Sequence, residues 1–178
     1  MLSQQAKVLF IYSSIDGQTE KIVRFMCTKF KNPKDIKMIK LENVFSVNLD
    51  SFDMIILGAS IRYGKHNKKA HLFIKKNIHL LSQKKTVFFS VNVVARKLNK
   101  DTAETNPYVI KFLKQTNWSP TLAGVFAGKV DYPNYSIFEK LVIKFIMFIT
   151  KGPTDTSQSY EFTNWQKVEL FTQKINEL

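Results

Sequence analysis

The sequence predicts an α/β fold in which a doubly wound, five-stranded parallel sheet carries helices on both faces. The first reason is that short runs rich in β-forming residues alternate with longer segments of helical periodicity. The second is that the first such run, residues 7–13, has the continuous apolar pattern of a strand buried on both faces. The third is a loop rich in Ser, Gly and Thr after this run, where sheets of this kind bind ligands.

Five short segments are expected to form the strands. Each combines apolar and β-forming residues and is bounded by polar residues or turn signals. In chain order they are Lys7–Ser13, Asp35–Leu41, Phe52–Gly58, Lys85–Val91 and Thr121–Val130. The connection between the second and third segments is too short for a full helix, so only a turn or two is expected there.

Four helices are expected between and after these strands. The second spans residues 68–83, the third begins near Pro107 with proline in its first turn, and the last is capped by Thr163 or Asn164. The residues of the first two helices expected to face the core are Ile22, Val23, Met26 and Phe30, then Leu72, Ile74, Ile78 and Leu81.

These elements are expected to form one domain over residues 1–178, with strand order 2-1-3-4-5. Residues 131–158 do not fit the alternation of strands and helices. They lie between the fifth strand and the last helix, so we interpret them as an insertion that contains an amphipathic helix. The single cysteine, Cys27, fits a reducing compartment, and the amino-terminal residues lack the apolar core of a signal peptide.

The net charge of +13 is concentrated in one part of the chain. Residues 62–100 contain eleven Lys or Arg, all three histidines and no Asp or Glu. Such a positive face suits nucleic acid, anionic lipid headgroups or an acidic small molecule, or it is only a solvated surface. No helix-turn-helix, zinc or RNA-recognition pattern accompanies it, so we expect neither nucleic acid as a partner nor a metal.

The loop SSIDGQT, residues 13–19, joins the first strand to the first helix. A phosphate there would meet backbone N–H groups, the positive end of the helix dipole and the hydroxyls of Ser14 and Thr19. The loop has no Lys or Arg, and it lacks the spacing of a nucleotide triphosphatase or of a dinucleotide site. A monophosphate such as that of FMN remains, and the alternative is that Ser and Thr only cap the helix.

Two further loops are expected at the same edge of the sheet, because the carboxyl ends of parallel strands meet there. They are GASIRYGK, residues 58–65, and SVNVVARK, residues 90–97. Their backbone amides suit the pyrimidine edge of a flavin. Tyr63 suits stacking on its ring, although an ordinary surface tyrosine is the alternative.

The insertion contains IFEKLVIKFIMFIT, residues 137–150, in which ten of fourteen residues are large and apolar. As a helix it would rise about 21 Å, too little to cross about 30 Å of hydrocarbon. We expect it to lie in a membrane interface with its lysines at headgroup level, and a satellite core is the alternative. The residues expected to face lipid are Ile137, Phe138, Leu141, Val142, Ile143, Phe145, Ile146, Phe148 and Ile149.

Several of these motifs resemble one known family. FIYSSIDGQT, GASIRYG, SVNVVARK, TNPYVIKFL and GPTDT resemble the menaquinone-dependent protoporphyrinogen IX dehydrogenases, the flavodoxin-like form of protoporphyrinogen oxidase. The similarity covers essentially the whole chain in order, and GASIRYG and SVNVVARK are its most specific parts.

The resemblance implies a flavodoxin-like fold, non-covalent FMN, and oxidation of protoporphyrinogen IX to protoporphyrin IX in haem biosynthesis. Electrons would pass to a membrane quinone, menaquinone or ubiquinone, at an anionic lipid surface on the cytoplasmic face of the inner membrane. The oligomeric state is left open, a homo-oligomer included. The residues expected around FMN are Ser14, Ile15, Asp16, Gly17, Gln18, Thr19, Ser60, Tyr63, Ser90, Val91, Asn92, Val93, Thr154, Asp155 and Thr156.

The flavin would carry the redox chemistry, so no catalytic side chain is assigned. Because the porphyrinogen bears two propionates, candidate anchors near the flavin are Arg62, Lys65, Arg96 and Lys97. The preferred interpretation of His66 is a loop histidine, with proton transfer as the alternative. The alternative function is a flavodoxin-type electron carrier, or a quinone reductase without porphyrinogen activity, but typical flavodoxins are acidic and this chain is basic.

Overall fold

The computed structural model describes residues 6–30 and 36–178. The expected absence of a signal peptide concerns mainly residues 1–5, and the predicted second strand starts at Asp35, so both lie partly outside the described residues. The strands of the main sheet are β1 (Val8–Ser13), β2 (Ile36–Lys40), β3 (Met54–Arg62), β4 (Lys65–His66), β5 (Lys85–Val91) and β6 (Leu122–Phe126).

Five of these strands form a parallel sheet in the order β2-β1-β3-β5-β6, and the short β4 pairs antiparallel with the end of β3. The predicted order 2-1-3-4-5 is therefore confirmed, because β5 and β6 are the fourth and fifth predicted strands. The order reverses between β1 and β3, which is the switch point at which such sheets bind ligands.

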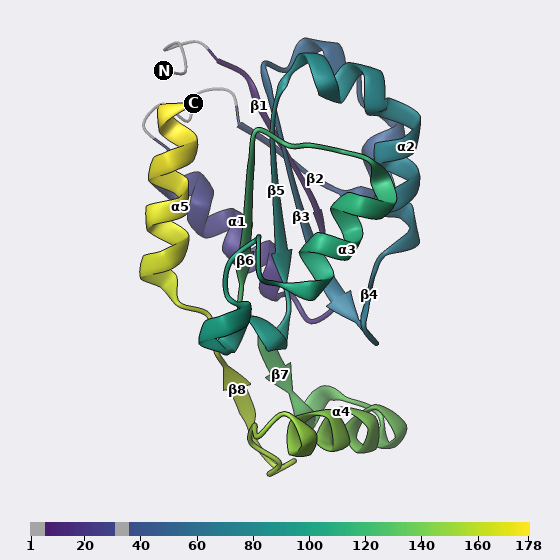
Figure 1. Ribbon diagram of the computed structural model, residues 1–178, viewed down its shortest axis with the longest axis vertical. Coiled ribbons are helices and arrows are strands. Elements are labelled where there is room, and N and C mark those ends of the chain that lie inside the picture. Colours follow the sequence, from purple (N-terminus) through teal and green to yellow (C-terminus); the bar gives the residue numbers. More distant parts are fainter. Residues whose placement is uncertain (1–5, 31–35) are drawn as a thin grey trace.

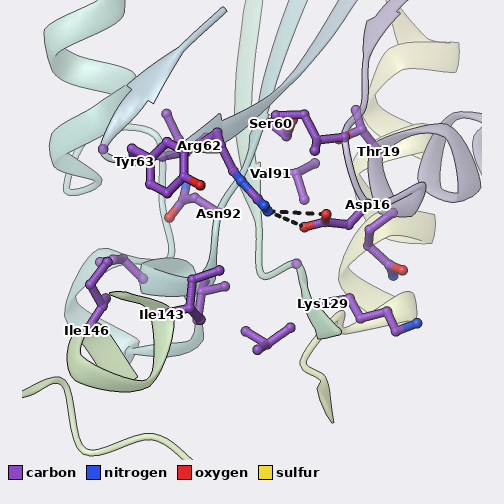
Figure 2. Close-up of a pocket in the computed structure, with 18 of the residues that line it drawn as sticks. Asp16, Thr19, Ser60, Arg62, Tyr63, Val91, Asn92, Lys129, Ile143 and Ile146 are labelled. Atoms are coloured by element: carbon purple, nitrogen blue, oxygen red, sulfur yellow. Dashed lines mark hydrogen bonds and ion pairs between the residues drawn. The ribbon is translucent and has the colours of Figure 1, made fainter. Parts of the chain in front are cut away.

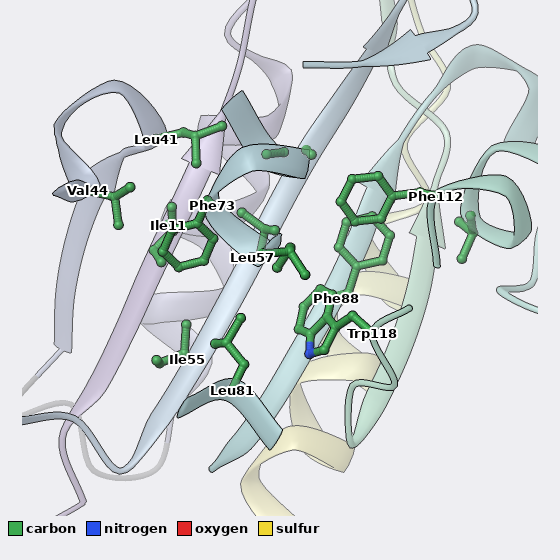
Figure 3. Close-up of a cluster of buried hydrophobic side chains, with 14 of the residues drawn as sticks. Ile11, Leu41, Val44, Ile55, Leu57, Phe73, Leu81, Phe88, Phe112 and Trp118 are labelled. Carbon is green, nitrogen blue, oxygen red and sulfur yellow. The ribbon is translucent and has the colours of Figure 1, made fainter. Parts of the chain in front are cut away.

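Helices cover both faces of the sheet (Figure 1), α1 (Gln18–Lys29) and α5 (Trp165–Glu177) on one face and α2 (Lys68–Gln83) and α3 (Pro107–Thr116) on the other. Successive residues of β1 point to opposite faces. Leu9 and Ile11 therefore pack with α2 and α3, where Phe73 and Phe112 lie (Figure 3), whereas Val8 and Phe10 pack with α1 and α5. The alternation predicted from the sequence thus produces two hydrophobic cores, one on each side of the sheet.

Short 3-10 helices connect several of these elements. They are η2 (Leu41–Ser46), η3 (Leu49–Ser51), η4 (Val93–Arg96) and η5 (Leu98–Lys100). The first two form the connection between β2 and β3, so the expectation of only a turn or two is confirmed there. The η4 turn follows β5 directly, and the side-chain oxygen of Asn92 accepts a hydrogen bond from the Ala95 N–H at 3.1 Å. This cap fixes the loop that leaves the carboxyl end of β5.

Two predictions about these elements are wrong. The predicted strand Thr121–Val130 is interrupted after Phe126, and the chain resumes as β7 (Lys129–Asp131), which pairs with β8 (Ser159–Glu161) in a separate small sheet. The break lies beside Gly128, whose carbonyl accepts a hydrogen bond from the Phe162 N–H at 3.0 Å, outside the main sheet. Leu72 was expected to face the core but is exposed, because Ala70, Phe73 and Ile74 form the buried side of α2.

The insertion is held by the β7-β8 pair and contains η6 (Tyr132–Asn134) and α4 (Ile137–Ile149). Ser136 and Glu139 form a reciprocal capping box that starts α4. The helix lies beyond the carboxyl ends of the main strands (Figure 1). Its inner side contributes Met147 to a third hydrophobic cluster with Val130, Tyr132 and Tyr135. None of the described helices has both the length and the apolarity needed to cross a bilayer.

Candidate active site

A cavity lies at the carboxyl ends of β1, β3 and β5, at the switch point of the sheet. It encloses about 820 Å³, the solvent at its mouth included. All three loops predicted from the sequence contribute to it. Of the residues predicted to surround FMN, those that line the cavity are Ser14, Ile15, Asp16, Gln18, Thr19, Ser60, Tyr63, Val91, Asn92 and Val93.

The loop before α1 is built to receive an anion. Gly17 occupies the N-cap position with φ 77°, and no side chain caps the helix. The Oγ of Ser14 and the Oγ1 of Thr19 are buried, and neither has a hydrogen-bond partner among the described residues. Buried hydroxyls are nearly always paired, so two unpaired ones at a helix N-terminus fit the phosphate of a bound ligand. The alternative, that Ser and Thr merely cap the helix, is wrong for this loop.

Tyr63 and Gly64 form the tight turn between β3 and β4, with φ values of 49° and 74°. A bulky residue at positive φ is strained, and such strain is concentrated at functional sites. The turn leaves the Tyr63 side chain 53% exposed at the edge of the cavity. Its hydroxyl donates to the Oε1 of Glu139 at 3.2 Å. The ring is therefore held by the turn at one end and by the insertion at the other.

Arg62 joins the insertion to the phosphate loop. Its guanidinium donates to both carboxylate oxygens of Asp16, at 3.2 and 3.1 Å (Figure 2), and also to Glu139 of α4. The Tyr135 hydroxyl donates to the same Asp16 carboxylate at 2.9 Å. The Ser136 N–H and the Arg62 guanidinium lower the pKa of Glu139 to about 2, so the pair is ionised at neutral pH. Arg62 is thus neutralised by two carboxylates, and the prediction that it anchors a propionate is not supported.

Other predicted residues lie away from this cavity. Arg96 donates to the Thr150 carbonyl and hydroxyl, both at 2.8 Å, and so ties the end of α4 to η4. Lys97 does not line the cavity, and neither do residues 154–156; Thr154 lies instead in a groove on the outer side of α4. The chain after α4 continues to β8, so the structure does not bring residues 154–156 to the cavity where they were predicted.

A buried polar network supports the cavity floor. Ser90, predicted beside the flavin, lies beneath Asn92 and is within 2.9 Å of His66 Nε2. Asn92 is joined in turn to Asn106, which caps α3. His66 packs on the rings of Phe88 and Phe112. Burial lowers its pKa from 6.5 to about 3, so it is neutral at pH 7 and does not face the cavity. His66 is thus a buried residue of β4, so its interpretation as a loop histidine is wrong, and its position outside the cavity does not support the alternative of proton transfer there.

We predict that His66 makes the protein less stable in mild acid. Because its pKa is lower in the folded state, the unfolded chain binds the proton first, and the free energy of unfolding falls as the pH drops below 6.5 toward about 3. The loss from this residue reaches about 2 kcal/mol at pH 5. Urea unfolding of the wild type and of His66→Gln at pH 7 and pH 5 measures it. An equal loss in both proteins would contradict the assignment.

Several residues of the cavity wall were not named from the sequence as contacts. Ile61, Gly64 and Val94 belong to two of the predicted loops, and Ile143 and Ile146 were assigned to lipid. The wall residues that the sequence did not indicate at all are Tyr108, Gly128, Lys129, Val130, Tyr135 and Met147. Ile143 and Ile146 extend from α4 toward the cavity (Figure 2). The prediction that both face lipid is therefore corrected for Ile143, which is half-buried, and modified for Ile146, which is 40% exposed at the cavity edge. Val142 is also only half-exposed.

The chain is similar to proteins of known family. Residues 9–157 match the model of a flavodoxin domain. A protein named protoporphyrinogen IX dehydrogenase [quinone] from Leishmania major is 39% identical over 173 residues, which is 96% of this chain and 75% of that protein. The protein of the same name from Escherichia coli K12 is 34% identical over 173 residues, which is 97% of this chain and 96% of that protein.

A solved structure supports the fold independently. Oxidised flavodoxin 1 from Bacillus cereus superposes with a TM-score of 0.53 at 16% identity, over 97% of this chain and 98% of that one. At this identity the similarity shows the fold alone. The family model and the two relatives show that the chain belongs to the flavodoxin domain family. Within it, the chain belongs to the quinone-dependent protoporphyrinogen IX dehydrogenases, a family of oxidoreductases.

Proposed function

We propose that the protein oxidises protoporphyrinogen IX to protoporphyrin IX in haem biosynthesis, with non-covalent FMN as cofactor and a membrane quinone as acceptor. The relatives' names support the substrate and the acceptor. The observation that carries the cofactor is the pair of buried, unpartnered hydroxyls of Ser14 and Thr19 at the start of α1. Flavodoxin-like sheets hold FMN at this β1/β3 switch point. Each pair of hydrogens removed from the porphyrinogen reduces one quinone to its quinol.

In this proposal the chain's own residues bind and orient. When bound, FMN would supply the redox chemistry, which is acceptance of hydride from the substrate and transfer of electrons to the quinone. Ser14, Thr19 and the N–H groups at the start of α1 hold the phosphate. Tyr63 and the loop Val91–Val93 lie against the ring system, since all of them line the cavity beside the phosphate loop. The apolar side chains Ile143 and Ile146 exclude water from the same space.

We further propose that the outer face of α4 lies on an anionic membrane as a peripheral anchor, on the cytoplasmic face of the inner membrane. The support is the exposure of this face: Ile137, Phe138, Leu141, Phe145, Phe148 and Ile149 are each at least 61% exposed. Lys140 and Lys144 belong to the same helix and suit headgroup phosphates. The inner side of α4 lines the cavity, so one short helix would bring the membrane and its quinone close to the flavin.

The function is tested by following porphyrin fluorescence after protoporphyrinogen IX is added to FMN-loaded protein, with and without menaquinone or ubiquinone, under anaerobic conditions. We expect fluorescence to rise only when protein, FMN and quinone are all present. A protein that carries FMN but gives no quinone-dependent fluorescence would be an electron carrier or a quinone reductase without porphyrinogen activity. The names of the relatives do not favour that alternative.

A further inference from the structure

A second cavity adjoins the candidate active site. It is formed where β4 meets the beginning of α2 and one side of α3. Gly64 and Tyr108 line both cavities, so only the edge formed by these two residues separates them. Gly64 is in the left-handed region, and a Cβ built on it would lie 4.0 Å from the Tyr108 ring. The two cavities therefore adjoin at this edge.

The charges that line the second cavity are all of one sign. Lys65, Lys68 and Lys111 contribute ammonium groups, and no Asp or Glu lines it. None of these three lysines forms an ion pair with a carboxylate in the described part of the chain. The two histidines of the wall add no charge at neutral pH, because burial lowers the pKa of both His66 and His71. Three uncompensated cations thus surround one hollow.

The position of Lys68 is a second indication that the cavity binds an anion. It is the first residue of α2 and Lys69 follows it, so two cations stand at the positive end of the helix dipole, where acidic residues are normally favoured. The first turn of α2 contains no acidic residue. A chain selected only for stability gains nothing from this arrangement. A bound anion would be attracted by both the lysines and the helix end.

We propose that the cavity formed by Lys65, Lys68 and Lys111 binds the propionate carboxylates of the porphyrinogen and so orients the macrocycle over the flavin cavity. The proposal rests on the proposed function and names the residues that recognise its substrate. Of the propionate anchors predicted from the sequence, this proposal retains Lys65. It excludes Arg62, which pairs with Asp16 and Glu139, and Arg96, which binds Thr150. The lysines act as positioning residues, since they would bind the carboxylates and not the ring carbons that are oxidised.

The test compares protoporphyrin IX with its dimethyl ester, which has the same ring but no carboxylate charge. The variant combines Lys65→Gln, Lys68→Gln and Lys111→Gln. The control combines Lys75→Gln, Lys76→Gln and Lys114→Gln, which remove the same charge from exposed positions of α2 and α3 outside the cavity. Binding is followed by porphyrin fluorescence in neutral detergent micelles. We expect the variant to bind the diacid at least about tenfold more weakly than the control does, with equal binding of the ester.

Kinetics should agree with binding: KM for the porphyrinogen should rise at least about tenfold in the variant and not in the control, while FMN affinity stays unchanged in both. Equal weakening for diacid and ester, or no difference from the control, would overturn the proposal. So would a variant whose only defect is weaker binding to anionic phosphatidylglycerol vesicles, because the lysines would then serve lipid phosphate. Wild-type protein that binds the diacid through these lysines but lacks quinone-dependent oxidation would uphold the site and refute the proposed function.

Discussion

Replacing Ser14 with Ala and Thr19 with Val should weaken FMN binding by on the order of 10²–10⁴-fold and leave the cofactor-free protein no less stable. Each hydroxyl is buried and has no partner among residues 6–30 and 36–178, so its removal from the apoprotein breaks no hydrogen bond there. With FMN present, each would donate to a charged phosphate, which is worth about 1.5–3 kcal/mol per bond. Quenching of FMN fluorescence measures the affinity, and urea unfolding of the apoprotein measures the stability.

A matched control is Thr172→Val on α5, whose buried hydroxyl donates to the Val168 carbonyl at 2.8 Å. That change should lower the free energy of unfolding by about 1 kcal/mol and leave FMN affinity unchanged. The double variant and the control are therefore expected to show opposite patterns. If the double variant lost apoprotein stability and retained FMN, the hydroxyls would belong to the folding of the loop and not to a phosphate site.

The fold could be predicted from the sequence because periodicity and burial determine it. The run Val8–Ser13 is buried at every position, and strand order follows once the alternation of strands and helices is recognised. The three loops of the cavity were predictable for the same reason, since parallel strands end at one edge. These inferences use local patterns whose geometric consequences are nearly unique.

The remaining features depend on long-range contacts that no local pattern encodes. Arg62 meets Glu139 across 77 residues, and the sequence shows only a cation near a predicted flavin. Whether that cation is free for substrate depends on where the insertion folds back. The same placement decides that Ile143 faces the cavity and Phe145 the solvent. It also decides that residues 154–156 lie outside the cavity, although their motif resembles one beside a cofactor.

The sequence presented membrane contact and a satellite core as alternatives for α4, and its two faces differ in a way that fits both. Met147 is 1% exposed and belongs to a satellite core with Tyr132, as the core interpretation required. Most of the remaining circumference is apolar and exposed, as membrane contact would require. The satellite core uses the inner face of α4 and the proposed membrane contact would use the outer face, so a test of membrane binding must change only the outer face. Changes at Ile143 or Ile146 would also disturb the cavity that they line.

We therefore predict that Phe138→Ser, Phe145→Ser and Phe148→Ser together reduce binding to anionic liposomes by on the order of 10²–10⁴-fold. These side chains are 71%, 64% and 73% exposed, so the folded protein loses little packing when they are shortened. Removing each from the bilayer interface forfeits about 1–2 kcal/mol of apolar burial. Liposome co-sedimentation at several salt concentrations measures the effect, and FMN fluorescence shows that the cavity is intact.

The control replaces three comparable exposed residues elsewhere, Phe45, Leu72 and Leu170, by Ser. If any exposed apolar side chain could hold the protein on lipid, both variants would dissociate alike, and the assignment of α4 as anchor would be wrong. If α4 is the anchor, only its variant dissociates. Its quinone-dependent oxidation should then fall with membrane-bound quinone but persist with a short-chain, water-soluble quinone. That difference follows from the geometry, because the outer face of α4 would deliver the acceptor, whereas the cavity that its inner face lines would remain intact.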